Sequence, residues 1–382
     1  MNQNARTIDE REKALLARYA TFSCDSIERN HPEPPHPYRG PFQRDRDRIV
    51  HCSAFRRLSG KMQVFNGQMG DYHRTRLTHT MEVASIARTI GRALGLNEDL
   101  IETLALMHDI GHPPFGHAGE DALDECLQDF GGFSHNRFAI TITTELEHPY
   151  PDYAGLNLTS VILDAQASRI DKTQTNCLPR LEAQVVDLAD SITYDAHDVD
   201  DAVKLNLLTI DQLLEIPLVH ECYDRVVDAS PNLEGQRLRQ ALVHQLLDRQ
   251  VGDTLEHTAN QLQHFDPESA DAGRKVRLRA THKLEDDKAE LEAFLHENVY
   301  RHHDLIAIRK HAQNRLRTMF DRFIADPELL PVPFQTRSRV VGIELAVRDY
   351  IAGMTDSFCH RQFEFLCQSP ALTNWVTTDG RG

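Results

Sequence analysis

The chain has 382 residues, a formal net charge of -16 and a pI near 5.7, which argue against a broad surface for nucleic acid or an anionic membrane. Its seven cysteines are an odd set without a CxxC pair, so neither a disulfide framework nor a thiolate zinc site is expected. No signal pattern opens the sequence and no run of about 18 apolar residues occurs in it, so we predict a cytoplasmic protein without a membrane span.

The first elements in chain order are a surface helix and an extended arm. Apolar residues among charges predict a helix over residues 8–20, and the Pro- and His-rich residues 31–41 exclude one there. Residues 39–61 then carry seven basic side chains against only Asp45 and Asp47. This basic segment has two interpretations: it binds phosphate, or it forms surface ion pairs with those aspartates.

Helical periodicity predicts two buried helices over residues 78–96 and 97–107, joined by a short turn at Gly95. The sequence HPPFG at residues 112–116 must interrupt the helix because its paired prolines remove backbone donors. A helix can resume over residues 118–127. A loop therefore follows His108 and Asp109 directly.

The rest of the chain is also predicted to be helical. Residues 145–181 form an irregular or partly helical excursion, whereas residues 182–208 have a strong helical pattern. Helical periodicity continues to the end, with breaks near residues 265–271 and 327–333. Because alternating strand patterns are few, we predict an all-α fold in one compact body.

The candidate chemistry lies in a set of histidines and aspartates. His108 and Asp109 end an apolar helix, and a second His and Asp from other helices would complete a mixed N/O site for a divalent ion. His79 and Asp190 are the candidates. An isolated His-Asp pair is more often a buried, hydrogen-bonded histidine.

A helical face of acidic residues contains Asp190. Its members fall three or four residues apart, and they are Asp187, Asp190, Tyr194, Asp198 and Asp201. Such a face is usually solvated, but Tyr194 and the apolar flanks make full exposure less favourable. The spacing alone leaves both interpretations open.

These residues resemble a known family. The pattern of His79, His108-Asp109 and Asp190 resembles the HD superfamily, and the blocks RDRDRIVHCSAFRRLSGKMQVF, YHRTRLTHTMEVASIARTIGRALGLN and HDIGHPPFGHAGEDAL closely resemble the bacterial deoxyguanosinetriphosphate triphosphohydrolase-like family. GGFSHNR, GLNLT, EAQVVDLAD and RDYIAGMTD extend the resemblance over about residues 40–360. It implies an HD helical core at 74–200, an N-terminal arm and basic segment at 1–73 packing on it, and a C-terminal helical region at 201–382.

The resemblance also implies a reaction and a cofactor. A deoxynucleoside triphosphate (dNTP), either dGTP or a broader set, would be hydrolysed to deoxynucleoside and inorganic triphosphate by metal-activated water that attacks the α-phosphate. The implied ligands of one divalent ion are His79, His108, Asp109 and Asp190. Mn²⁺ or Mg²⁺ is the first expectation, while Fe²⁺, Co²⁺, Ni²⁺ and Zn²⁺ also suit such ligands.

Four further residues are expected to act in catalysis. The 5′-alkoxide is a poor leaving group, so a proton donor is worth roughly 10²–10⁴ in rate. His117 is our first choice as donor, and Glu120 would orient it. His112 and His135 are expected to contact phosphate, and for both a hydrogen-bonded loop histidine is an equal alternative.

Five residues are expected to bind the substrate. Arg57 and Arg76 would bind phosphate oxygens, because arginine offers bidentate geometry. By resemblance, Gln63, Tyr194 and Asp198 would surround the deoxyribose, with Asp198 accepting from the 3′-hydroxyl and Tyr194 packing against C2′. Crowding there would exclude a ribose 2′-hydroxyl.

Two departures from the family pattern put the substrate preference and turnover in doubt. Arg137-Phe138 stands where Gln-Ser is common, close to His135, and Ser191 replaces a frequent acidic residue after Asp190.

The family further implies a homo-oligomer and a second, allosteric dNTP site.

Two alternatives stay open. One is another HD enzyme, a 5′-nucleotidase or phosphodiesterase, which would use the same metal with a different phosphorus in line. The other is a non-catalytic regulator that binds nucleotide or single-stranded nucleic acid through residues 39–61. The net charge of -16 disfavours nucleic acid as a partner.

Overall fold

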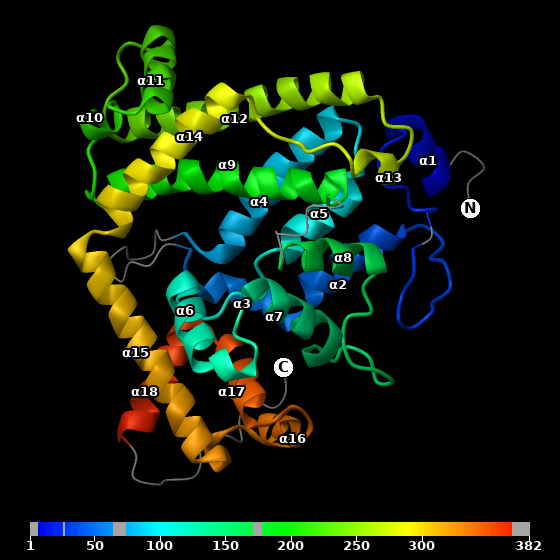
Figure 1. The fold of residues 1–382 in the computed structure, drawn as a ribbon, viewed down its shortest axis with the longest axis vertical. Coiled ribbons are helices and arrows are strands. Elements are labelled where there is room, and N and C mark those ends of the chain that lie inside the picture. The colour runs from blue at the N-terminus through cyan, green and yellow to red at the C-terminus, as the bar shows by residue number, and fades with distance from the viewer. Residues whose placement is uncertain (1–6, 26, 64–73, 171–177, 369–382) are drawn as a thin grey trace.

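The structure is a computed structural model that describes residues 7–25, 27–63, 74–170 and 178–368. The described residues are helical or lie in loops, with two isolated β-bridges and no strand among them (Figure 1). The all-α prediction is confirmed. Among the described helices, none is long and apolar enough to cross a lipid bilayer.

Short helices form the N-terminal part, and they are α1 (Ile8–Leu15), α2 (Pro41–His51) and α3 (Ser53–Arg57) with the 3₁₀ turn η1 (Leu58–Gly60). The predicted helix over 8–20 is thus shorter, because the chain turns after Leu16 and the Ala17 amide donates to the Gly95 carbonyl. Residues 31–40 lack helix, as predicted. Pro41 is the first residue of α2, a position where proline is tolerated because its missing amide proton would have no partner within the helix.

The central part contains α4 (Arg76–Ala93), α5 (Glu98–Met107), α6 (Gly116–Cys126), α7 (His135–Thr141), α8 (Ser160–Ser168) and α9 (Leu181–Lys204). Side-chain caps set two of these starts. The Thr75 hydroxyl accepts from the Thr78 amide at α4, and the Asn97 side chain accepts from the Leu100 amide at α5. Between them Gly95 adopts φ 67°, a left-handed conformation suited to glycine.

The C-terminal part contains α10 (Ile210–Leu213), α11 (Pro217–Ala229), α12 (Gly235–Phe265), α13 (Ala270–Gly273), α14 (His282–Leu295), α15 (His303–Ala325), α16 (Val332–Val341), α17 (Ile343–Ala352) and α18 (Asp356–Gln368). The predicted breaks near 265–271 and 327–333 coincide with the end of α12 and the start of α16. Figure 1 shows α9 crossing the molecule, with α12 and α14 on one side of it and α6, α7, α15 and α17 on the other.

Two apolar clusters form the core. The larger runs from Ala20 to Leu366 and so joins residues from the N-terminal, central and C-terminal parts. The smaller joins the end of α9 to α10, α11, α12 and α14, with Leu246 and Leu284 fully buried. Within the larger cluster, α4 packs on both α5 and α9, and α5 also packs on α9. The domain boundaries at 73/74 and 200/201 remain a prediction.

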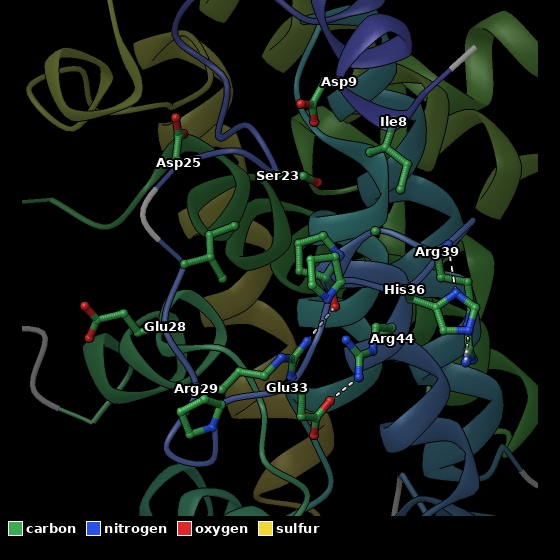
Figure 2. Close-up of a pocket in the computed structure, with 15 residues that line it drawn as sticks. Ile8, Asp9, Ser23, Asp25, Glu28, Arg29, Glu33, His36, Arg39 and Arg44 are labelled. Atoms are coloured by element: carbon green, nitrogen blue, oxygen red, sulfur yellow. Dashed lines mark hydrogen bonds and ion pairs between the residues drawn. The ribbon is translucent and has the colours of Figure 1, made fainter. Parts of the chain in front are cut away.

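The basic segment is mostly paired with acidic side chains. A cavity of about 680 Å³ is lined by α1, by the extended arm (residues 31–40) and by the start of α2. Figure 2 shows Arg44 pointing toward Glu33 in this cavity. Arg39 contacts Asp47 at 2.7 Å, and Arg48 contacts Glu33 at 2.6 Å. The pair of Arg39 with Asp47 agrees with the ion-pair interpretation. Arg44 and Arg48 pair instead with Glu33, which lies outside residues 39–61, and Asp45 pairs with Arg29.

Candidate active site

Three of the four proposed metal ligands, His79, His108 and Asp190, have ligand atoms that lie within 4.8 Å of one another, whereas Asp109 adjoins this group through His108 and itself groups with His112 and His135. His79 lies in the first turn of α4, His108 and Asp109 follow the last turn of α5, and Asp190 lies in the middle of α9. His79 Nε2 lies 3.1 Å from Asp190 Oδ1, and His108 Nε2 lies 3.7 Å from the same oxygen. His108 Nε2 is also 3.4 Å from Asp109 Oδ1. The packing of α4 and α5 on α9 therefore assembles the mixed N/O set.

The buried His108 ring tests whether these residues fit a cation. Its Nδ1 lies 2.5 Å from the Ala105 carbonyl oxygen, so Nδ1 carries the proton and Nε2 holds a lone pair. Within the described residues Nε2 has no hydrogen-bond partner, and it faces the carboxylates of Asp109 and Asp190. A lone pair facing carboxylates in a buried site is unfavourable without a cation. The donor set thus fits a divalent ion.

The electrostatics keep the two carboxylates ionised. Burial raises the pKa of Asp190, but His108, the hydrogen bond from His79 and the Arg169 guanidinium together hold that pKa below its ordinary value. Burial likewise opposes ionisation of Asp109, yet His108 and His112 outweigh it and the pKa is lowered. Ionised carboxylates and neutral imidazoles are the forms that bind metal.

A chain of contacts orients the His79 ring through its Nδ1, the nitrogen that does not face Asp190. Its Nδ1 lies 3.3 Å from His197 Nδ1, and the other nitrogen of His197 contacts the Glu82 carboxylate. A bound cation would replace the hydrogen bond from His79 Nε2 to Asp190, so that Nε2 offers a lone pair, the Nδ1 proton points to His197 and the His197 Nε2 proton points to Glu82. The acidic face of α9 is not solvated along its whole length. Its members Asp198 and Asp201 are buried, and so is the adjacent His197.

The four predicted catalytic residues lie around the HPPFG loop. Glu120 on α6 accepts from His135 Nδ1 at 2.8 Å and from His117 Nδ1 at 3.2 Å. The rings of His112 and His135 stack with centroids 3.8 Å apart, and His112 Nε2 lies 3.2 Å from Asp109 Oδ1. His112 is buried, whereas the His117 side chain is 59% exposed. Exposure leaves His117 accessible to a ligand.

A cavity of about 290 Å³ adjoins this group, lined by Met62, Gln63, Arg76, Phe115, His117, Ala118, Tyr194, His296, Tyr300, Leu305 and Arg309. Arg76 is 1% exposed and donates to Asp109 Oδ2 at 2.8 Å, so one arginine connects the metal ligands to the cavity. Of the predicted substrate residues, Gln63, Arg76 and Tyr194 line it. The Gln63 side-chain oxygen is buried and lacks a hydrogen-bond partner among the described residues.

Asp198 does not line this cavity itself but contacts Tyr300, which does. The Tyr300 hydroxyl donates to the Asp198 carboxylate and also contacts the Tyr194 hydroxyl. Burial raises the pKa of Asp198 to about 8. Sequence reasoning missed Tyr300 and the neighbouring His296, Leu305 and Arg309, because no motif marks them and they lie about a hundred residues beyond α9.

Arg57 does not line the cavity beside His117. It borders a separate cavity of about 880 Å³ together with Arg337 and Arg361, and it donates to the Ser53 hydroxyl at 3.1 Å. Burial lowers the pKa of its guanidinium. A contact between Arg57 and phosphate remains a prediction that this placement does not support.

The two sequence departures lie outside the ligand cluster. Arg137 donates to the Gly131 carbonyl at 2.6 Å on the surface, and Phe138 is buried against Phe133. Phe138 thus contributes to the core, while His135 keeps its contact with Glu120. Nothing in the structure explains Ser191.

Comparisons with known proteins identify the class and then the family. A model of the HD domain matches residues 76–195, and a model of the phosphohydrolase-associated domain matches residues 278–364. The chain is therefore an HD-domain phosphohydrolase, a class in which divalent metals are bound.

Three curated relatives resemble almost the whole chain. Deoxyguanosinetriphosphate triphosphohydrolase-like proteins of Geobacter sulfurreducens, Caulobacter sp. (strain K31) and Brucella anthropi are 40%, 41% and 40% identical to it. The matches cover 93%, 92% and 90% of this chain and 96%, 96% and 94% of those proteins. The chain belongs to this family.

Proposed function

We propose that the protein hydrolyses deoxynucleoside triphosphates to deoxynucleoside and inorganic triphosphate. The observation that carries the proposal is the junction between the metal-ligand cluster and the cavity beside His117, which Arg76 spans. A triphosphate in this cavity would have its α-phosphate near the ligands and its sugar near Tyr194. The names of the relatives support the same substrate class.

His79, His108 and Asp190, which the structure groups, would hold one divalent ion together with Asp109 beside His108, with Mn²⁺ or Mg²⁺ as the first expectation. When bound, the ion supplies a Lewis acid at an α-phosphate oxygen and lowers the pKa of water. Arg76 adds a fixed positive charge on the phosphate side, since its Nε is buried and lacks a hydrogen-bond partner among the described residues. This residue would stabilise charge that develops on the phosphate oxygens.

His117 would protonate the leaving 5′-oxygen. Its Nδ1 contacts Glu120, so the proton to be transferred lies on Nε2, which can turn to the cavity that His117 lines. Glu120 also fixes His135, whose ring supports His112 by stacking. His112 and His135 do not line this cavity, and their contact with the phosphates stays a prediction.

Tyr194 and Asp198 would recognise the deoxyribose, with Gln63 beside them. The Tyr194 and Tyr300 hydroxyls contact each other where both residues line the cavity, and we expect this crowding to exclude a 2′-hydroxyl. A 3′-hydroxyl would compete with the Tyr300 hydroxyl for the Asp198 carboxylate.

A screen of purified protein against each dNTP with each divalent metal tests the proposal. Ion-exchange chromatography resolves deoxynucleoside, triphosphate, pyrophosphate and orthophosphate. Deoxynucleoside with intact triphosphate supports it. Orthophosphate or pyrophosphate favours an HD nucleotidase or phosphodiesterase, and salt-dependent binding of single-stranded nucleic acid without turnover favours a regulator.

Assembly and activation are part of the proposal by family resemblance. We expect a homo-oligomer whose turnover responds to a second dNTP. Size-exclusion chromatography with and without dNTP tests both expectations, and an invariant monomer with simple saturation kinetics would contradict them.

A further inference from the structure

Two buried charged side chains hold the HPPFG loop, and neither belongs to the proposed catalytic or metal-binding set. The Lys61 ammonium donates to the His112 carbonyl at 2.5 Å and to the Ala352 carbonyl at 3.0 Å. The Asp356 carboxylate accepts from the Phe115 amide at 3.0 Å and from the Met62 amide at 2.9 Å. Lys61 is 3% exposed and Asp356 is 7% exposed.

The loop needs external partners because of its sequence. Pro113 and Pro114 have no amide donor, so the Phe115 amide is the first donor after His112. Phe115 adopts φ 65°, a left-handed conformation that is costly for a bulky residue. The Asp356 carboxylate takes the amide of this strained residue, and therefore fixes the conformation that starts α6.

This fixed start controls the position of the catalytic candidates. α6 begins at Gly116, directly after Phe115, so His117 is the second residue of its first turn. At the other end of the loop, the His112 carbonyl contacted by Lys61 belongs to the residue whose ring stacks on His135. Both ends of the loop are thus connected to α17 or the start of α18.

Burial makes a purely stabilising role for these charges unfavourable. Burial lowers the pKa of Lys61 to about 7 and raises the pKa of Asp356, so each loses solvation in its charged form. Replacing buried charges with apolar groups of similar volume is often neutral or stabilising. A role in fixing geometry accounts better for their presence on either side of one loop.

We propose that Lys61 and Asp356 are positioning residues that hold the HPPFG loop so that His112 and His117 meet the substrate. The part concerning turnover rests on the proposed function, and the part concerning the loop does not. Each part therefore has its own measurement.

Asp356→Asn and Lys61→Met are the test variants, because both roughly keep side-chain volume. Asp349→Asn is the matched control, since Asp349 is a buried carboxylate of α17 that pairs with Arg337 and Arg348 away from the loop. The loop is monitored by amide hydrogen exchange of residues 111–120 in the full chain. Catalysis is monitored as kcat and KM, and metal binding as the Mn²⁺ dissociation constant.

We expect at least tenfold faster loop exchange in both test variants and no change in the loop for the control. kcat should fall at least tenfold, with KM and the Mn²⁺ dissociation constant within threefold of wild type. The conservative Asp356→Glu variant should recover part of kcat. Faster exchange in a chain whose wild type lacks turnover would refute the proposed function and leave loop positioning supported.

Unchanged loop exchange in folded Asp356→Asn and Lys61→Met would overturn the proposal. It would also be overturned if kcat fell equally in Asp349→Asn, because loss of any buried charge from this region would then suffice. A parallel loss of Mn²⁺ affinity would reassign the two residues to the metal site.

Discussion

Replacing Glu120 with Gln should slow turnover without weakening metal binding. The two oxygens of the Glu120 carboxylate accept hydrogen bonds from His117 and His135. Gln has one side-chain oxygen, so it would lose at least one of these two hydrogen bonds. A hydrogen bond to a charged group is worth about 1.5–3 kcal/mol, which corresponds to a roughly 10- to 160-fold lower kcat if the bond acts in the transition state. Loss of the proton donor itself, as in His117→Ala, should cost roughly 10²–10⁴.

The assay compares kcat for Glu120→Gln, His117→Ala and the double variant under saturating metal. Since Glu120 would act largely through His117 and otherwise only through His135, the double variant should be slower than His117→Ala by much less than the factor that Glu120→Gln costs in the wild type. Glu125→Gln is the matched control, because Glu125 lies on the same helix and pairs with Arg317 at the surface. We expect it to keep wild-type kcat.

Independent, multiplicative losses in the double variant would refute the orienting role of Glu120. Wild-type kcat in Glu120→Gln, with His117→Ala inactive, would also contradict it. Loss of kcat in Glu125→Gln would indicate that any charge change on α6 disturbs the site.

Four further outcomes are expected. Asp190→Ala should abolish metal-dependent turnover with an unchanged far-UV circular dichroism spectrum, and retained turnover would remove Asp190 from the site. Glu82→Gln should weaken Mn²⁺ binding by roughly 10- to 100-fold in calorimetry, because a Gln amide can donate to His197 and disturb its proton arrangement; an unaltered dissociation constant would contradict the contact chain. Burial lowers the pKa of Lys61 to about 7, so above this pH the unfolded chain binds the extra proton, and Lys61 should contribute a rise in stability from about pH 7 toward 10.5 of up to about 1.4 kcal/mol per unit. Urea unfolding of Lys61→Met should lack this slope. Leu316→Ala should lower the free energy of unfolding by about 2–5 kcal/mol in the same assay, since its side chain is fully buried, and a loss under about 1 kcal/mol would refute tight packing there.

Helix positions were predictable where the local sequence determines them. The caps at Thr75 and Asn97 and the prolines of the HPPFG loop fix their boundaries within a few residues. The helix α8 (Ser160–Ser168) was less visible, because residues 145–181 have weak periodicity and its place depends on packing against α5 and α7.

The candidate site divides in the same way. His108-Asp109 stands out in the sequence, but the link to His79 and Asp190 came from family resemblance. The structure groups His79, His108 and Asp190, with Asp109 beside His108. Tyr300 could not be predicted, since its contact with Asp198 depends on how α14 and the turn after it return to α9. Contacts between distant segments leave no local pattern in the residues.

The contact of Asp356 with Phe115 also has a consequence for synthesis. All four proposed metal ligands leave the ribosome before Asp356 does, so the helices that carry them can pack while the HPPFG loop still lacks its partner. The nascent chain would then be able to capture metal before it can orient His117. Maturation of the site would be a late event, completed only when the segment with Asp356 docks.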